Sequence, residues 1–183
     1  ILAIAACENK PQNPLLEDFN TPHQTPPFDQ IKTEHYEPAF DAAIEEARDE
    51  IRALTASSEE PTFENTIVAL DFTGERLNNI AGIFFNLNAA MTDDEMQEIA
   101  QRVSPKLTAY GHEITLNPEL FKRVKKVYEQ TASLHLHPEQ SSLLEKIWRS
   151  FINGGANLEG EARERFKEVS IELSKLGHIF DKN

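Results

Sequence analysis

The sequence predicts an all-α fold, with about six long, mostly antiparallel helices preceded by a proline-rich extended arm. Apolar residues recur at intervals of three and four positions from Phe40 to Phe180, the spacing that places them on one face of a helix. No segment after Phe28 alternates apolar and polar residues with the two-residue period of a β-strand. The turns between the helices are short, so helices that are consecutive in the sequence are expected to pack antiparallel.

The length of 183 residues suits one domain, because domains commonly hold roughly 100–200 residues. We divide the chain into a tether over residues 1–12, the proline-rich arm over residues 13–32 and a helical region over residues 33–183. A chain of this length removes roughly 70% of its unfolded surface from water and can therefore form a core.

The composition excludes several classes of function. Asp and Glu number 31 against 18 Lys and Arg, so the formal net charge is −13. A chain this acidic is a poor ligand for nucleic acid, and it cannot bind anionic lipid through charge alone. A single cysteine excludes an internal disulfide and a cysteine-based zinc finger. No apolar run reaches the length of about 18 residues that a membrane span needs.

The cysteine stands at the end of a short apolar segment. Ile4-Ala5-Ala6-Cys7 resembles the lipobox of bacterial lipoproteins, in which a branched apolar residue and two small residues precede the cysteine that is acylated. We therefore predict Cys7 as a lipidation site, with residues 1–6 as the end of a signal segment. This predicts a lipid-anchored protein of the bacterial cell envelope, periplasmic or surface-exposed, that meets the membrane only through its anchor. The alternative is an apolar start with one buried or free cysteine.

Five of the ten prolines lie between Pro11 and Pro27. Proline fixes φ and removes a backbone donor, so this segment is expected to be extended. A simple linker would lack the large apolar residues Leu15, Leu16, Phe19 and Phe28. We expect the arm to lay these side chains onto a neighbouring surface.

The first two helices follow the arm. Thr33 is a candidate cap for the first, which ends before Pro61, and Thr62 caps a long second helix. The first stripe is Phe40, Ile44, Ala47, Ile51 and Leu54, and the second is Ile67, Leu70, Leu77, Ala81 and Phe84, widened by Ile80, Ile83 and Leu87. Gly74 and Gly82 inside the second helix cost about 1 kcal/mol each relative to alanine, so close helix packing is expected there.

Four further helices complete the chain. Thr92 and Glu95 form a capping box for the third, which Pro105 is expected to kink or split. Asn117-Pro118 and Pro138 open the fourth and fifth. The apolar stripes are Met96, Ile99, Val103, Leu107, Tyr110 and Ile114 in the third, Leu120, Phe121, Val124, Val127 and Tyr128 in the fourth, and Leu143, Leu144, Ile147, Trp148, Phe151 and Ile152 in the fifth, which Gly154-Gly155 ends.

The sixth helix, from Gly160 to Phe180, carries a narrow apolar seam at spacings of four and three, which is typical of helix–helix packing. Its members are Ala162, Phe166, Val169, Leu173, Leu176 and Phe180.

The histidines do not form a metal site in the sequence. A zincin helix needs His-Glu-x-x-His, but the run that begins at His112-Glu113 has Leu116 at the second ligand position. We interpret His112 as part of a solvated helix end. His135 and His137 could bind a metal weakly, but an exposed turn is the favoured interpretation.

Other polar groups have structural interpretations. His35 and Glu37 are expected to cap a helix start, and Cys7 lacks the positioned histidine of a catalytic thiol. Lys122-Arg123 and Lys125-Lys126 are interpreted as the wet face of a helix, with a patch for acidic ligands as the alternative. We assign no catalytic and no metal-binding residue, and the substrate-binding residues are unknown at this stage.

An ordered series of short motifs nonetheless carries a family resemblance. They are Asn13-Pro14-Leu15-Leu16, Thr25-Pro26-Pro27-Phe28-Asp29-Gln30-Ile31, His35-Tyr36-Glu37-Pro38-Ala39-Phe40, Pro61-Thr62-Phe63-Glu64-Asn65-Thr66-Ile67 with Ala69-Leu70, Phe84-Phe85, Leu116-Asn117, Leu120-Phe121-Lys122-Arg123-Val124, and Phe151 with Gly155-Ala156-Asn157-Leu158. In this order they resemble the N-terminal region of bacterial peptidyl-dipeptidases, within the thimet oligopeptidase-like zinc metallopeptidase family.

The resemblance implies an almost entirely helical, two-lobed parent protein around a deep channel that admits short, unfolded peptides. It also implies zinc held by His-Glu-x-x-His and a further glutamate, and removal of dipeptides from free C-termini. The N-terminal helices would form one wall of the channel and contact the remainder of the peptidase chain.

The sequence departs from the family in length, since the zinc motif of the family lies far downstream of the matched region. No metal ligand and no catalytic glutamate of the family can be carried onto a residue here. We therefore expect an N-terminal fragment that binds no catalytic zinc, cleaves no peptide and exposes an apolar patch or self-associates through it. The alternative is a stand-alone helical lipoprotein that acts as a binding or scaffold module.

Overall fold

The computed structural model describes residues 13–181, without the side chains at positions 174–175 and 178–181. The predictions for Cys7 and for the tether over residues 1–12 lie outside this range. The α-helices are α1 (Tyr36–Ala56), α2 (Ala69–Phe72), α3 (Glu75–Ala90), α4 (Asp94–Thr115), α5 (Pro118–Glu129), α6 (Pro138–Asn153) and α7 (Gly160–Asp181). Residues 13–181 contain no β-strand, which confirms the all-α prediction.

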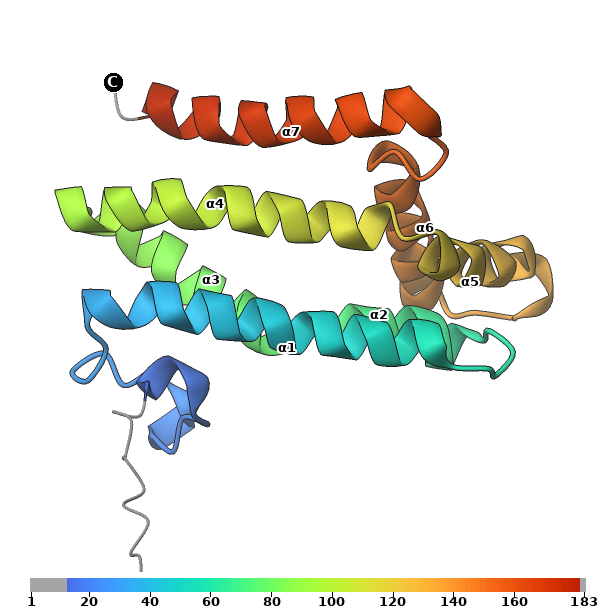
Figure 1. Cartoon of the computed structure of the whole chain (residues 1–183). Helices are drawn as coiled ribbons and strands as arrows, with labels where there is room; N and C mark the ends of the chain where they lie inside the picture. The colour runs from blue at the N-terminus through green and yellow to red at the C-terminus, as the bar shows by residue number, and fades with distance from the viewer. Residues whose placement is uncertain (1–12, 182–183) are drawn as a thin grey trace, which may run out of the picture.

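The long helices lie side by side, as Figure 1 shows. Helix α3 packs on α1 and runs opposite to it, and α4 lies between α1 and α7. Helices α5 and α6 pack together at the end of the molecule where α1 and α4 finish. Helix α7 runs back along α4, on the side of α4 that faces away from α1, and α4 is its principal neighbour.

Two apolar clusters form the core. The first joins the arm, α1, α3 and α4, and its buried members include Leu15, Tyr36, Phe40, Ile80, Phe84, Ile99 and Val103. The second joins the end of α1 to α5 and α6, and it includes Ile51, Phe63, Ile67, Leu120, Val124, Val127, Leu144 and Phe151. Ile114 near the end of α4 packs against both clusters. The helical stripes predicted from α1 to α6 therefore supply the core.

The arm is extended apart from two single 3₁₀ turns, η1 (Pro14–Leu16) and η2 (Pro22–Gln24), and a hydrogen-bonded turn over residues 28–30. Leu15 is buried, and the side-chain amide of Asn13 donates a hydrogen bond to the backbone oxygen of His35 at 2.8 Å. The arm thus packs on the start of α1 as predicted for Leu15. The expectation is wrong for Phe28, which is 55% exposed.

The expected long second helix is broken into three pieces. A π-helical segment, η4 (Phe63–Val68), is capped by Thr62 as predicted and leads into α2, and the break before α3 falls at Gly74. Gly74 has φ of +70°, a left-handed conformation that glycine adopts without a Cβ clash. Its N–H donates to the carboxylate of Glu50 at 2.7 Å, which fixes the break against α1. Close packing was expected at Gly82 as well, but this position is open.

Helix α4 differs from its prediction in two details. Its cap is Asp93 rather than Thr92, because the Asp93 carboxylate accepts the N–H of Met96 at 2.8 Å. The helix also continues through Pro105 without splitting. Val103 and Tyr110 on either side of the proline are both buried in the same core, and this packing holds the two halves together.

Only one described large side chain of the apolar seam predicted for α7 packs on another helix, since the ring of Phe166 meets His112 of α4 edge to face. Val169, Leu173 and Leu176 are 44%, 67% and 53% exposed. Helix α7 meets α4 mainly through Phe166 and the stripe beside it that contains Arg163 and Lys167. The seam prediction is therefore confirmed for Phe166 and wrong for Val169, Leu173 and Leu176, which form the expected exposed apolar patch.

Gly154, which ends α6, is packed too closely for any side chain. A Cβ at this position would lie 2.6 Å from the Cβ of Thr115 and 2.8 Å from the backbone oxygen of Ser150. We expect Gly154→Ala to destabilise the chain by about 1–3 kcal/mol, because neither neighbour can move without disturbing α4 or α6. Urea denaturation measures this loss.

The matched control for this variant is Gly82→Ala, which adds the same methyl group in open space inside α3. It should stabilise the chain by up to about 1 kcal/mol through helix propensity. Equal stability of the Gly154→Ala variant and the native chain would contradict the close approach.

Candidate functional site

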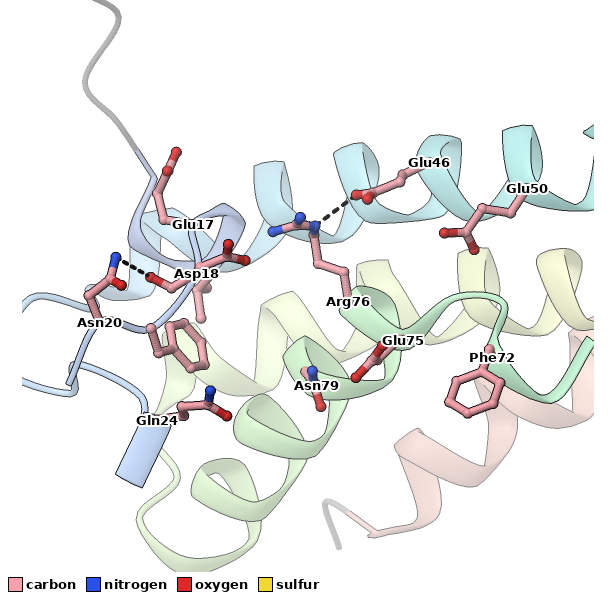
Figure 2. A pocket seen from close by; sticks show the side chains of 12 residues that line it. Glu17, Asp18, Asn20, Gln24, Glu46, Glu50, Phe72, Glu75, Arg76 and Asn79 are labelled. Carbon is pink, nitrogen blue, oxygen red and sulfur yellow. Dashed lines mark hydrogen bonds and ion pairs between the residues drawn. The ribbon is translucent and has the colours of Figure 1, made fainter. Parts of the chain in front are cut away.

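A groove of about 540 Å³ lies between the arm and the helices α1 and α3, as Figure 2 shows. The arm contributes Leu15, Glu17, Asp18, Phe19, Asn20 and Gln24, α1 contributes Glu46 and Glu50, the end of α2 contributes Phe72, and α3 contributes Glu75, Arg76 and Asn79. Carboxylates dominate this lining, and Phe72 is 68% exposed.

Arg76 is the structural centre of this groove. Its Nε lies 2.8 Å from Glu46 Oε2 on α1, and its Nη1 donates to the backbone oxygen of Leu16 in the arm at 2.6 Å. One guanidinium therefore ties α3 to both α1 and the arm, and Figure 2 shows its ion pair with Glu46. We interpret the groove as part of the contact that holds the arm against α1 and α3.

A second pocket, of about 360 Å³, lies between α4 and α7. We call it the α4–α7 pocket. Its lining is Ala109, His112, Glu113 and Leu116 from the second half of α4, with Arg163, Lys167 and Ile171 from the first half of α7. Three of these seven residues, His112, Arg163 and Lys167, have basic side chains, although the chain as a whole is acidic.

Some polar groups of the α4–α7 pocket have hydrogen-bond or ion-pair partners within the chain, and others have none. Glu113 is held by Arg48 of α1 through two hydrogen bonds, at 2.7 and 2.6 Å, and Lys167 pairs with Glu164 at 2.9 Å. Arg163 donates from Nη2 to the backbone oxygen of Leu116, at the end of α4. Its Nε is buried without a hydrogen-bond partner, and so is Nε2 of His112.

His112 is not part of a solvated helix end, as the sequence had suggested. Its ring is half-buried and meets the ring of Phe166 edge to face, with 5.4 Å between the centroids. Burial, followed by the charge of Lys167, lowers the pKa of His112 below its ordinary value. The imidazole is therefore largely neutral near pH 7. The contact arises because α7 folds back over α4, which no local pattern indicates.

The other candidate residues lie at separate places in the structure and do not form one site. His135 and His137 are exposed in the connection before α6, as favoured from the sequence, and His137 lies at the helix N-cap. His35 precedes α1 and accepts the N–H of Lys32 at its Nδ1, a capping role as expected. Within residues 13–181 no three histidine, cysteine or carboxylate side chains lie close enough together to hold a metal ion.

The side chains of the basic cluster on α5 are not all exposed to solvent. Arg123 is only 7% exposed, and its guanidinium enters the connection between α1 and η4. Lys122 and Lys125 are exposed, so the interpretation as a wet face holds for them and is wrong for Arg123. Arg123 therefore serves the fold and is not available to an acidic ligand.

Sequence reasoning missed Arg163 and Lys167 as members of a pocket. Their spacing of four residues places them on one face of α7, and this was the available signal. The more conspicuous apolar seam on another face of the same helix was preferred as the packing surface. Among the described residues no helix is apolar enough over a sufficient length to cross a membrane.

Known proteins give a consistent picture of relatedness. The chain is 38% identical over 169 residues to a dipeptidyl carboxypeptidase of Salmonella typhimurium and 37% identical over 169 residues to one of Escherichia coli. It is 27% identical over 171 residues to oligopeptidase A of Escherichia coli. These alignments cover 92% or 93% of this chain but only 25% of each relative. No protein-family model matches the chain.

These similarities extend over almost the whole chain and confirm the resemblance that the sequence motifs indicate. The chain spans about a quarter of the length of the curated relatives that it matches. It belongs to the family of the dipeptidyl carboxypeptidases and oligopeptidases A, the thimet oligopeptidase-like peptidases.

Proposed function

We propose that this chain forms one wall of the substrate channel in a zinc metallopeptidase that removes dipeptides from the C-termini of short, unfolded peptides. The observation that supports this most directly is the 37–38% identity, over 92% of the chain, to two proteins named dipeptidyl carboxypeptidase. The described residues provide no set of ligands that fits zinc, so the metal would be bound by residues of a longer polypeptide. This chain would then shape the channel and take no chemical step itself.

The exposed face of α7 supports a role as part of a larger body. Val169, Leu173 and Leu176, which we call the α7 stripe, follow each other at spacings of four and three on one exposed face. Contiguous exposed apolar surface on a globular chain commonly marks an interaction site. We infer that the remainder of a peptidase chain covers the α7 stripe, since the relatives are about four times as long as the aligned region.

Peptide cleavage is the direct test of this function. The polypeptide encoded by the same gene should carry an in-frame His-Glu-x-x-His beyond Asn183. It should release dipeptides from an N-blocked tetrapeptide with a free C-terminus, and a chelator should abolish this release. The purified 183-residue chain should release none. Chelator-sensitive release by the 183-residue chain would contradict its passive role, and a stop codon soon after Asn183 would favour a helical lipoprotein that acts as a binding module.

The α7 stripe should make the isolated chain self-associate. We expect its weight-average mass in sedimentation velocity to rise above 20.7 kDa with concentration, and Leu173→Glu to keep it near that value. The control is Phe72→Glu, because Phe72 is 68% exposed, like Leu173 at 67%, but lies outside α7. If both variants change the mass equally, or if the native chain is monomeric at every concentration, self-association through the α7 stripe is refuted.

We further propose that Cys7 is acylated and anchors the protein in the bacterial cell envelope. The support is the lipobox-like order of residues in Ile4-Ala5-Ala6-Cys7. Expression of the complete gene product in bacteria should place it in the membrane fraction, and Cys7→Ala should release it. A protein that stays in the membrane fraction after this substitution would refute the anchor.

A further inference from the structure

We propose that the α4–α7 pocket binds an organic carboxylate, with Arg163 and Lys167 as the charged partners and Leu116 and Ile171 against the apolar part of the ligand. The proposal rests on the proposed function, because it assigns the carboxylate to the free C-terminus of a short peptide. A carboxylate on an Asp or Glu side chain has the same chemistry, and the experiment below separates the two sources.

The charges around the pocket favour an anion. Arg163 has no carboxylate within 4.0 Å among the described residues, although the chain has 31 acidic residues to offer. The only carboxylate in the lining, Glu113, is already held by the two hydrogen bonds from Arg48. An arginine guanidinium is the side chain best suited to bind a carboxylate through parallel hydrogen bonds. The pocket therefore presents one cation that no carboxylate pairs with, Arg163, beside a second, Lys167, which pairs with Glu164 at the surface.

Two nitrogen atoms in the lining have donor capacity that a polar ligand could use. Nε of Arg163 and Nε2 of His112 are buried without a hydrogen-bond partner. Leaving such a group unpaired costs about 1–3 kcal/mol, so native proteins rarely tolerate two at one place without a reason. Small movements of both side chains toward one carboxylate in the pocket would give each of the two nitrogen atoms an acceptor. His112 would then be the neutral tautomer with its proton on Nε2.

The size and the walls of the pocket fit the end of a peptide. A volume of about 360 Å³ lies in the range of small-ligand sites, which is roughly 300–1,000 Å³. Ala109, Leu116 and Ile171 provide apolar surface next to the charged groups. A carboxylate here would also counter the positive charge of Lys167 that lowers the pKa of His112.

The test is a titration of the isotope-labelled 183-residue chain, followed by amide NMR shifts. The probe is N-acetyl-alanyl-alanine, which has a free C-terminal carboxylate. One comparison ligand is the same peptide with a C-terminal amide, and the other is N-acetyl-aspartyl-alanine amide, whose only carboxylate is on a side chain. We expect saturable shifts at His112, Leu116, Arg163 and Lys167 with the free carboxylate alone.

Substitutions locate the binding to the pocket. Arg163→Gln and Lys167→Gln should each weaken binding about tenfold or more, as expected for a hydrogen bond to a charged group. Arg165→Gln is the matched control, because Arg165 lies on the same helix, is 70% exposed in its side chain and does not line the pocket. Arg163→Gln also removes the hydrogen bond to Leu116, so Lys167→Gln decides the question if the former variant loses its helical circular dichroism.

Equal binding of the peptide amide, or an equal loss with Arg165→Gln, would overturn the carboxylate site. Equal binding of the aspartyl peptide amide would overturn its assignment to the peptide C-terminus. The titration needs no catalysis, so its failure is distinct from a failure of the longer polypeptide to release dipeptides.

Discussion

Replacing Phe84 with alanine is expected to destabilise the chain by about 3–5 kcal/mol, the cost of a large cavity in a packed core. Phe84 is completely buried and meets three rings edge to face. Its centroid distances are 5.0 Å to Tyr36, 5.6 Å to Phe40 and 5.1 Å to Phe85. The first two rings belong to α1, so the substitution removes aromatic contacts between α3 and α1.

Urea denaturation followed by circular dichroism measures this effect. Phe72→Ala serves as the control, because Phe72 is 68% exposed and its loss should change the free energy of unfolding by less than about 0.5 kcal/mol. If the Phe84→Ala variant is too unstable to purify, Phe84→Leu should show a smaller loss of the same sign. A loss below about 1 kcal/mol for Phe84→Ala would show that the aromatic cluster does not hold the first core together.

Replacing Arg123 with alanine is expected to cost about 2–4 kcal/mol, because four buried or partly buried hydrogen bonds lose their donor. Nη1 donates to the backbone oxygens of Ser57 and Glu59, each at 3.1 Å. Nη2 donates to Asn65 Oδ1 at 3.3 Å and to Thr66 Oγ1 at 3.4 Å. One side chain of α5 thereby organises the whole connection from α1 to η4.

The matched control for Arg123 is Lys122→Ala, which removes a positive charge from the neighbouring, exposed position of the same helix. Denaturation should show almost no change for this control. Hydrogen exchange should also show lost protection between residues 57 and 66 in the Arg123→Ala variant. Equal stability of the two variants would mean that water replaces the guanidinium at no cost.

Periodicity predicted most of the fold because the core lies on helix faces. The stripes that contain Phe40, Ile67, Val103, Val124 and Phe151 are buried or partly buried, and each was visible as spacings of three and four. The break at Gly74 was missed because a glycine inside a periodic segment looks the same whether φ is negative or positive. What distinguishes it is the carboxylate of Glu50, which lies on another helix.

The candidate site was harder to predict because its partners are far apart in the sequence. His112 was interpreted as solvated, and only the return of α7 over α4 brings Phe166 and Lys167 to it. Arg123 was interpreted as solvent-exposed because it stands in a basic cluster of an amphipathic helix, while its acceptors lie in the connection after α1. The family, in contrast, was recognisable from short ordered motifs, since these do not depend on which residues meet in space.

Helix α7 packs almost entirely on α4, and this affects the order in which parts of the chain unfold. Both apolar clusters are complete without α7, so its detachment from α4 leaves them intact. Such an element opens at a lower free energy than the whole chain unfolds, and its amides exchange with solvent first. We therefore expect α1 to α6 to unfold together and α7 to detach first, and a partner that covers α7 would raise the free energy of that detachment.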